Sequence, residues 1–303
     1  MKVTLTGATG NMGREALFEL VKLKNIDKVK ILVLPDDQKR KNEILKNCKD
    51  YKEKIEVVIG NLKDFEVCEE IVKDVSYVIN LAAVIPPKSD KHPNLAIDCN
   101  QIGVKNLVKA IEQCEVQPKL IHTSTVALYG NRTHLHLWAT ACDPLLISPL
   151  DIYSITKLRG EFAVLESEIK NWTVLRQTAM LHTHMLADNM SDGLMFHTCF
   201  NAPLEWVTAH DSGVLIANII KKDSTRDLGT KFWKQVFNIG STKENKITGF
   251  QTLDDGFKLI GGSAKDFFKP YYNATRNFHG VWFEDGQRLN EMFDYISQDM
   301  ATY

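Results

Sequence analysis

The sequence predicts an α/β fold in which helices cover both faces of a doubly wound parallel sheet, with a smaller C-terminal lobe. Three observations lead to this prediction. Short apolar segments alternate with longer amphipathic ones, a glycine-rich turn joins the first apolar segment to the first amphipathic one, and the alternation ends near residue 178. Such alternation is typical of parallel sheets, because each parallel connection has to cross over the sheet.

Six short segments rich in valine, isoleucine and leucine are the predicted strands. They are residues 2–7, 29–34, 55–60, 75–83, 119–125 and 172–178. Their apolar residues form continuous runs, as expected of parallel strands that are buried on both faces. Helical patterns separate them, at residues 11–24, 37–50, 64–73, 94–115 and 153–169. Residues 1–178 are therefore predicted to form one doubly wound domain.

Residues 179–303 are predicted to form a second lobe that binds the substrate. A helical pattern at 210–220 and an apolar strand at 234–240 indicate that residues 205–240 partly interleave with the main sheet. The segment 179–200 is rich in methionine and histidine and has little periodicity, and the C-terminal residues are rich in aromatic side chains.

Charge and composition narrow the class of protein. The formal net charge of the 303 residues is −1 and no long basic segment occurs, which argues against a nucleic-acid partner. No apolar stretch approaches the roughly 18 residues of a membrane-spanning helix, and the first residues show no signal-peptide pattern. Six scattered cysteines suit a reducing compartment. We therefore expect a cytoplasmic protein with a small-molecule substrate and no membrane partner.

Gly7, Gly10 and Gly13 follow the first predicted strand and precede the first predicted helix. In dinucleotide-binding proteins, the first such glycine allows a tight turn and the second lets the backbone approach the pyrophosphate. The third allows close packing of helix and strand, and the helix N-terminus attracts the phosphates. Residues 1–178 are therefore predicted to be a Rossmann-like domain that binds a nicotinamide dinucleotide.

The end of the second predicted strand carries signals for both dinucleotides. An acidic residue there would bind the ribose hydroxyls of NAD, whereas basic groups would accept the 2′-phosphate of NADP. Asp36 and Asp37 supply the first signal, and Lys39–Lys41 together with Arg14 supply the second. We favour NADP(H) and keep NAD(H) as the alternative.

Tyr153 and Lys157 are four residues apart in the predicted helix 153–169, which places them on one helix face. A free tyrosine titrates at about pH 10, too high for ready proton exchange at neutrality. A neighbouring ammonium and a positive nicotinamide ring both favour the phenolate, and would lower the pKa of Tyr153. The pair can therefore act as a proton-transfer dyad.

Motifs over about residues 1–215 resemble, in order, those of the extended short-chain dehydrogenase/reductase family. The motifs are TGATGNMG (6–13), GNLKD (60–64), VINLAA (78–83), NQIGVKNLVKA (100–110), HTSTVALYG (122–130), YSITK (153–157) and VLRQTAM (174–180). This family includes nucleotide-sugar epimerases, dehydratases and carbonyl reductases. The chain departs from the usual pattern at Asn61, at Asn80–Leu81 and at Gln177.

The resemblance implies roles for individual residues. Tyr153 would give or take the proton, and Lys157 would lower its pKa and hold the nicotinamide ribose. Thr125, with Ser124 as the alternative, would hydrogen-bond the substrate oxygen, and Asn100 would order the helix or a proton-relay water. The implied cofactor-binding residues are Gly7, Thr9, Gly10, Asn11, Met12, Gly13, Arg14, Asp36, Lys39, Asn61, Leu62, Leu81, Ala82, Ala83, Thr123, Tyr153 and Lys157.

The family carries several reactions on one hydride-transfer site, so the reaction needs separate evidence. Sugar dehydratases place Asp-Glu directly after the catalytic threonine, where this chain has Val126 and Ala127. Segment 179–200 contains no lysine or arginine, so we expect an uncharged, fairly apolar carbonyl or alcohol as substrate. The candidate substrate-binding residues are Ser124, Val84, Met180, His182 and Met185.

Our first interpretation is an NAD(P)-dependent oxidoreductase. One alternative is a nucleotide-sugar epimerase with retained NAD, in which Arg276 and Arg288 could bind the diphosphate. Another is a non-catalytic NAD(P)-sensing protein, which the intact tyrosine, lysine and threonine set disfavours. The histidines of segment 179–200 lack a metal-binding pattern, so no metal is expected. Helices 94–115 and 153–169 commonly form a dimer interface in the family, so a homodimer is implied.

Overall fold

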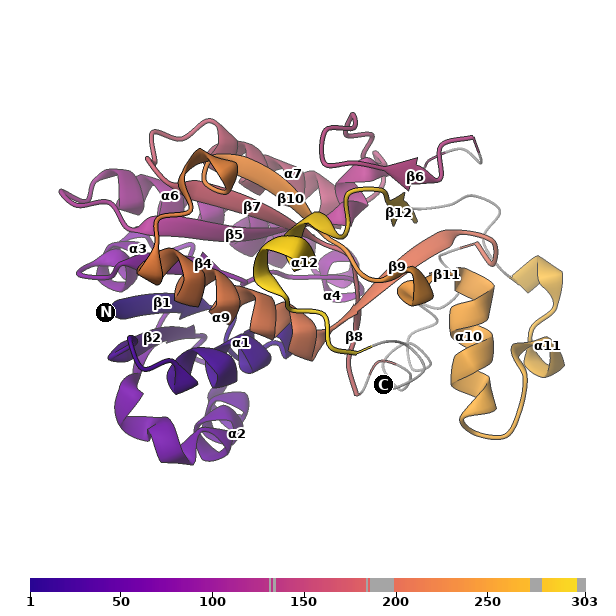
Figure 1. Cartoon of the computed structure of the whole chain (residues 1–303), viewed down its shortest axis with the longest axis horizontal. Helices are drawn as coiled ribbons and strands as arrows, with labels where there is room; N and C mark the ends of the chain where they lie inside the picture. Colours follow the sequence, from indigo (N-terminus) through magenta and orange to yellow (C-terminus); the bar gives the residue numbers. More distant parts are fainter. Residues whose placement is uncertain (131, 133–134, 184, 186–198, 273–279, 299–303) are drawn as a thin grey trace.

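A computed structural model of the chain describes residues 1–130, 132, 135–183, 185, 199–272 and 280–298. It confirms the predicted α/β class, with helices on both faces of a central sheet (Figure 1). The sheet has seven strands in the order β10-β7-β5-β4-β1-β2-β3, and all neighbouring pairs are parallel. The strands are β1 (Lys2–Thr6), β2 (Lys28–Val33), β3 (Ile55–Ile59), β4 (Tyr77–Asn80), β5 (Lys119–Thr125), β7 (Trp172–Gln177) and β10 (Gln235–Ile239).

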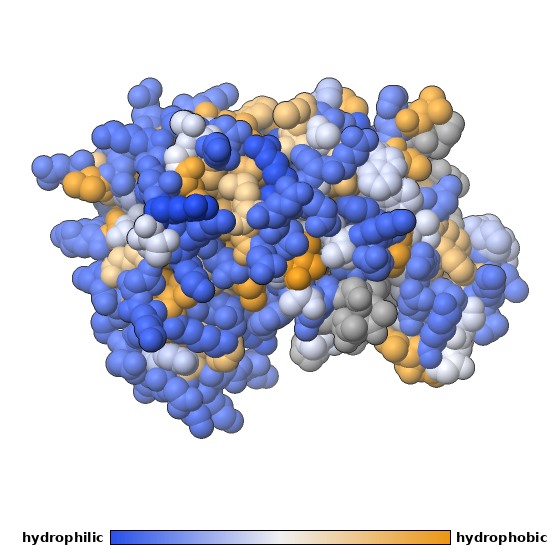
Figure 2. All heavy atoms as spheres, in the orientation of Figure 1, coloured by the Kyte–Doolittle hydropathy of each residue, from blue (hydrophilic) through white to orange (hydrophobic). Residues whose placement is uncertain are grey.

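Two layers of helices cover this sheet. One layer consists of α1 (Asn11–Lys22), α2 (Gln38–Asn47), α9 (Ala209–Thr225) and α12 (Arg288–Phe293), which share a buried apolar cluster with the strands. The other consists of α3 (Phe65–Val72), α6 (Val104–Glu112) and α7 (Ile152–Leu165), which share a second cluster. The strands are thus buried on both faces, and the outer surface seen in Figure 2 is mainly hydrophilic.

Two of the predicted helices are built from more than one piece. The predicted helix 94–115 consists of α5 (Pro93–Ala96), a π-helical turn η2 (Ile97–Gly103) and α6. The predicted helix 37–50 consists of α2 and the start of a 3-10 segment, η1 (Lys49–Lys54). The π-helical turn matters for the site, because it contains Asn100.

The C-terminal residues build smaller sheets beside the main one. Strands β8 (Ala179–Leu181), β9 (Pro203–Thr208) and β11 (Lys246–Thr248) form one, and β6 (Trp138–Ala139) pairs with β12 (Trp282–Phe283). Helices α10 (Gly249–Lys258) and α11 (Ala264–Phe267) lie at the end of the molecule away from β1 (Figure 1). The remaining short elements are α4 (Lys88–Lys91), η3 (Val126–Tyr129), η5 (Gly229–Lys231), η6 (Lys243–Asn245) and η7 (Pro270–Tyr272).

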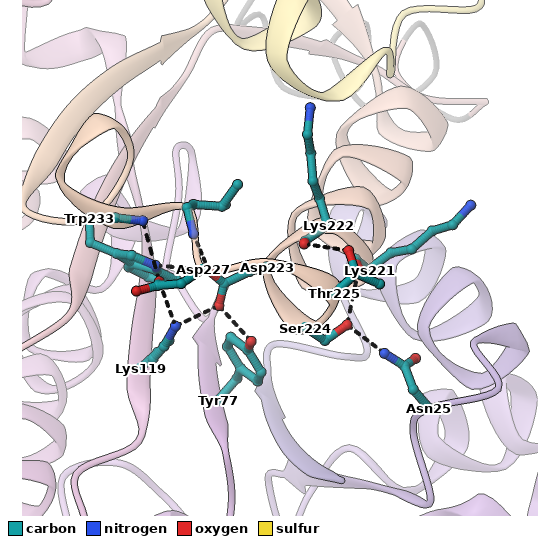
Figure 3. A network of polar contacts seen from close by, with 12 residues as sticks. Asn25, Tyr77, Lys119, Lys221, Lys222, Asp223, Ser224, Thr225, Asp227 and Trp233 are labelled. Carbon is teal, nitrogen blue, oxygen red and sulfur yellow. Dashed lines mark hydrogen bonds and ion pairs between the residues drawn. The ribbon is translucent and has the colours of Figure 1, made fainter.

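A buried carboxylate ties α9 to the amino ends of the central strands (Figure 3). Asp223 of α9 accepts hydrogen bonds from the Tyr77 hydroxyl at 2.6 Å, from Lys119 Nζ at 2.8 Å and from Trp233 Nε1 at 3.0 Å. Tyr77 begins β4 and Lys119 begins β5. The network therefore stabilises the amino ends of these strands, whereas the predicted site residues lie at the carboxyl ends.

The order of the strands places a crevice between β1 and β4. From β1 the chain builds outward through β2 and β3, and it then returns to add β4 on the other side of β1. In open α/β sheets, ligands bind outside the carboxyl ends of the strands at such a reversal. Among the described residues, no helix is both long and apolar enough to cross a lipid bilayer.

Candidate active site

The glycine turn at the end of β1 has the geometry that a pyrophosphate needs. The first amides of a helix lack intrahelical acceptors, and Gly10, which precedes α1, has no side chain to cap them. Gly7 has a φ of +72°, and a Cβ on it would lie 2.7 Å from the Ala82 nitrogen. A Cβ on Gly13 would lie 2.0 Å from the Gly7 oxygen. The residues present therefore fit a dinucleotide whose phosphates sit on the α1 N-terminus.

Further predicted cofactor residues line the neighbouring strand ends. The Thr6 hydroxyl donates to Asn80 Oδ1 at 2.6 Å and accepts from the Ala82 amide at 3.2 Å, which holds residues 81–83 beside the glycine turn. After β3, the Leu62 carbonyl accepts from Asn106 Nδ2 at 3.1 Å, while Asn61 lies half-buried next to it. Thr9 lies in the turn itself, Asn11 begins α1, and Met12 in the first turn of α1 is buried.

The expected preference for NADP(H) is not supported at the end of β2. Asp36 and Lys39 are both exposed. Arg14 Nη1 lies 3.7 Å from Glu43 Oε1, and Arg40 Nε lies 3.9 Å from Asp37 Oδ1. Arg14 and Arg40, two of the cations proposed to bind a 2′-phosphate, thus already face carboxylates. These carboxylates weaken the positive field that would attract the phosphate.

The predicted catalytic side chains come together at the carboxyl end of β5. Asp151 caps α7 by accepting from the Tyr153 amide at 3.0 Å, which fixes the first turn of this helix. Lys157, one turn further, donates from Nζ to the Thr123 carbonyl at 2.6 Å. Tyr153 shares a hydrogen bond with the Thr125 side chain. The structure therefore joins Tyr153, Lys157 and Thr125, which the sequence places on two separate elements.

The electrostatics of the pair differ in part from the prediction. Burial lowers the pKa of the Lys157 ammonium to about 8, although Cys99 and Glu161 act in the opposite direction. Burial also raises the pKa of the Tyr153 phenol to about 12, while the hydrogen bond with Thr125 opposes this rise. In the protein without NAD, the pKa of Tyr153 is therefore raised and not lowered as predicted, because burial disfavours the phenolate.

Asn100 joins the catalytic helix to the loop after β4. Its amide group accepts from the Val84 amide at 2.8 Å and donates to the Val84 carbonyl at 2.9 Å. It also donates to the Thr156 hydroxyl at 3.2 Å. Of the two roles implied for Asn100, these contacts match the ordering of helix and loop.

Two buried hydroxyls at the end of β5 have no partner within the described residues. They are Thr123 Oγ1 and Ser124 Oγ, and the exposed fractions of these residues are 9% and 2%. Buried polar groups are normally hydrogen-bonded. Thr123 shares a face of β5 with Thr125, so its hydroxyl fits a site that a polar ligand completes, whereas Ser124 points to the opposite face.

The predicted substrate residues are only partly placed near this site. Met180 is half-buried against the main apolar cluster, and Met185 packs on a small cluster that includes Leu181 and Trp206. Val84 is held through its backbone by Asn100, and His182 is half-buried. His184, residues 186–198 and Arg276 lie outside the described residues.

Sequence reasoning missed two buried polar groups near the site. In the first, Asn80 Nδ2 lies 3.0 Å from His122 Nδ1, where β4 pairs with β5. The second is an ion pair of Glu161 with Arg176. A polar residue inside an apolar strand pattern, such as Arg176 in WTVLRQ, is the signal that could have revealed them.

Comparison with known proteins gives one family and two kinds of enzyme. The model of the NAD dependent epimerase/dehydratase family matches residues 3–178. UDP-glucose 4-epimerase of Rickettsia bellii is 26% identical over 129 residues, which cover 41% of this chain and 37% of that protein. Fatty acyl-CoA reductase 1 of Gallus gallus is 29% identical over 155 residues, or 44% and 29% of the two chains. The chain thus spans less than half the length of these curated relatives.

Solved structures resemble the whole chain. A dTDP-glucose 4,6-dehydratase from Streptomyces venezuelae with NAD bound has a TM-score of 0.76 and 16% identity, and the match covers 99% of this chain and 94% of that one. A UDP-glucuronic acid 4-epimerase variant from Bacillus cereus, also with NAD, has a TM-score of 0.75 and 18% identity, with coverage of 100% and 96%. At such low identity these likenesses show the fold.

Proposed function

The chain belongs to the NAD dependent epimerase/dehydratase family, and we propose that it is a nucleotide-sugar epimerase that works with retained NAD. One observation carries this proposal: Tyr153, Lys157 and Thr125 meet at the carboxyl end of β5, two strands from the glycine turn that follows β1, within a chain whose curated relatives include UDP-glucose 4-epimerases. The comparisons thus favour the epimerase alternative over net oxidation or reduction of an apolar substrate.

The proposed mechanism needs only proton transfers from the chain itself. Bound NAD would supply the hydride acceptor and return the hydride. The Thr125 hydroxyl orients the substrate oxygen, and Tyr153 removes the proton from this oxygen and later gives it back. Lys157, held by the Thr123 carbonyl, places its ammonium beside these groups and favours the phenolate. Because the hydride taken by NAD would return to the opposite face of the same carbon, the configuration would invert with no net redox change.

We propose NAD as the dinucleotide. The family is described as NAD dependent, and the two structural neighbours named above contain NAD. The carboxylates beside Arg14 and Arg40 support this choice, because they oppose the binding of a further phosphate.

Elimination of water from the sugar is disfavoured for this chain. Val126 and Ala127 follow Thr125 directly, and both are buried. Neither can donate or accept a proton, so the acid and base that a dehydratase needs are missing from those positions.

A net reductase is the second candidate. Segment 179–200 has no lysine or arginine, and Arg288 of α12 lies over the Phe237 ring at 4.9 Å from its centroid. Cations for a sugar diphosphate are thus scarce, which favours an uncharged substrate. The local match to a fatty acyl-CoA reductase agrees with this alternative.

The test is to incubate the purified chain with UDP-glucose, UDP-glucuronic acid or dTDP-glucose and to detect the C4 epimer by NMR, with no nicotinamide nucleotide added. We expect conversion by the wild type and a rate at least about 100-fold lower with Tyr153→Phe. Absence of conversion, together with NAD(P)H-dependent reduction of an aliphatic aldehyde, would replace the epimerase by the reductase.

A further inference from the structure

A buried ion pair lies one helical turn beyond Lys157. Glu161 of α7 and Arg176 of β7 have side-chain exposures of 0% and 5%. Arg176 Nη2 donates to Glu161 Oε1 at 2.6 Å, and Arg176 Nε lies 3.2 Å and 3.3 Å from the two carboxylate oxygens. A guanidinium that contacts a carboxylate at several points fixes its direction as well as its distance.

The same guanidinium reaches the segment that follows Thr125. Arg176 Nη1 donates to the Tyr129 hydroxyl at 2.8 Å. Tyr129 is fully buried and ends η3, which begins directly after Thr125. One arginine therefore joins the helix of Tyr153 and Lys157 to the turn that carries Thr125.

Two more residues extend the network into the C-terminal part of the chain. The Tyr129 hydroxyl donates to Asn238 Oδ1 of β10 at 2.7 Å, and Asn238 Nδ2 donates to Asp285 Oδ1 at 3.0 Å. Asp285 Oδ2 accepts from the Ala141 amide at 2.7 Å, and the Ala141 carbonyl accepts from Arg176 at 3.1 Å. This closes a ring of contacts around Arg176. Ala141 and Asp285 follow β6 and β12, and Figure 1 shows these two strands in the upper part of the view, as it does α7, β7 and β10.

We propose that Glu161, Arg176 and Tyr129 form a positioning unit, which holds Tyr153 and Lys157 at working distance from Thr125. Glu161 has a second role: it follows Lys157 by one turn on the same face of α7, so its carboxylate stabilises the Lys157 ammonium. The proposal rests on the proposed function only in taking Tyr153, Lys157 and Thr125 as the reacting groups.

The charges around Lys157 single out Glu161. Lys157 is faced by Cys99 from η2, by His122 from β5 and by Glu161 from its own helix. Burial raises the pKa of the Cys99 thiol and holds the pKa of His122 well below its usual range, so both are neutral near pH 7. Of these three groups, Glu161 is therefore the carboxylate that offsets the burial of the ammonium, and Arg176, 2.6 Å away, shares its charge.

Carbon-13 NMR titration of lysine-labelled full chain, loaded with NAD, tests the charge role without any substrate. The Lys157 signal is assigned by its loss in Lys157→Met. We expect Glu161→Gln to lower the pKa of Lys157 by about half a unit or more. Glu166→Gln removes a charge from the exposed end of the same helix and should leave the titration unchanged. An unchanged Lys157 titration in Glu161→Gln, or an equal shift in Glu166→Gln, overturns the charge role.

Tyr129→Phe tests the positioning role, since it removes one hydroxyl and keeps the ion pair. We expect kcat to fall about tenfold or more, with KM, NAD content and the Lys157 titration unchanged. A wild-type kcat in Tyr129→Phe overturns the positioning role.

If Glu161→Gln does not fold, Glu161→Asp keeps the charge and must keep the Lys157 titration. If the wild type epimerises no nucleotide sugar, the proposed function fails, whereas the titration still decides the role of Glu161.

Discussion

At the scale of single residues, the site depends on the burial of two groups that ionise. Burial lowers the pKa of Lys157 to about 8 and raises the pKa of Tyr153 to about 12. The spacing predicted that Tyr153 and Lys157 share one helix face, and the resemblance to the family predicted that Thr125 joins them. The pKa of Tyr153 could not be predicted in this way, because it depends on desolvation by residues far away in the sequence.

Removal of the Tyr153 hydroxyl should abolish nearly all turnover. Tyr153→Phe keeps the ring and the packing but removes the group that exchanges the proton, so kcat should fall about 100-fold to 10,000-fold. The retained NAD should be unchanged, which steady-state kinetics and nucleotide analysis can measure together. A variant with near-normal kcat would show that Tyr153 is not the proton-transfer group.

The pH dependence of turnover should follow Lys157. The ammonium form is present below its pKa of about 8 and is lost as the pH rises through this value. Because the ammonium favours the Tyr153 phenolate, we expect kcat to decline on the alkaline side of about pH 8. A pH–rate profile of the wild type measures this limb, and a kcat that keeps rising to pH 10 contradicts the assignment.

At the scale of elements, the catalytic helix is placed by its close contact with the π-helical turn. A Cβ on Gly160 of α7 would lie 2.2 Å from the Asn100 carbonyl oxygen, so helix and turn pack backbone against backbone. The strands and helices 1–178 could be predicted from their apolar patterns. The π-helical turn could not, because segment 94–115 has a continuous helical pattern and Asn100 is held by tertiary contacts.

Gly160→Ala should therefore displace α7. The added methyl group meets backbone atoms that cannot rotate away, so we expect a loss of about 1–3 kcal/mol in the free energy of unfolding and a lower kcat. Urea denaturation and steady-state kinetics measure the two effects. Glu166→Ala, at the exposed end of the same helix, is the control and should change neither. A fully stable, fully active Gly160→Ala protein would contradict this packing.

At the scale of the whole molecule, buried polar contacts stabilise the amino ends of the central strands, and the candidate site lies at their carboxyl ends. The site lies at the carboxyl ends of β1, β4 and β5, whereas Asp223 joins α9 to the amino ends of β4 and β5. The return of residues 235–239 to the main sheet as β10 follows from an apolar pattern. The small sheets β8-β9-β11 and β6-β12 could not be predicted, because their short strands are stabilised by long-range pairing. The homodimer stays a prediction.

Asp223→Asn should destabilise the fold without touching the site. It leaves the half-buried Lys119 ammonium without its near partner, and we expect a loss of about 2 kcal/mol or more in the free energy of unfolding. Asp227→Asn is the matched control, because the Asp227 side chain also faces Lys119, at 3.3 Å, but is 73% exposed. Its effect should stay within about 0.5 kcal/mol. Equal effects of the two variants on thermal unfolding would contradict the role of Asp223.

The Asp223 network should also contribute to acid sensitivity. Burial raises the pKa of Asp223, but the hydrogen bonds from Lys119, Tyr77 and Trp233 outweigh it and leave the pKa below the usual 3.8. The stabilisation is thus present above the unfolded-state pKa of about 3.9 and is lost as the pH falls through the lower folded-state value. In denaturation curves between pH 7 and pH 2, the difference in stability between wild type and Asp223→Asn should shrink only at the acid end. A constant difference down to pH 2 contradicts the shift.

The most direct test of the central claim is to denature the purified chain and identify the released nucleotide by mass. An epimerase that recycles its dinucleotide in place should release NAD at about one molecule per chain. Two results together would contradict retained NAD and support a net oxidoreductase. The denatured chain would release no nucleotide, and the folded chain would bind added NADPH or NADH reversibly.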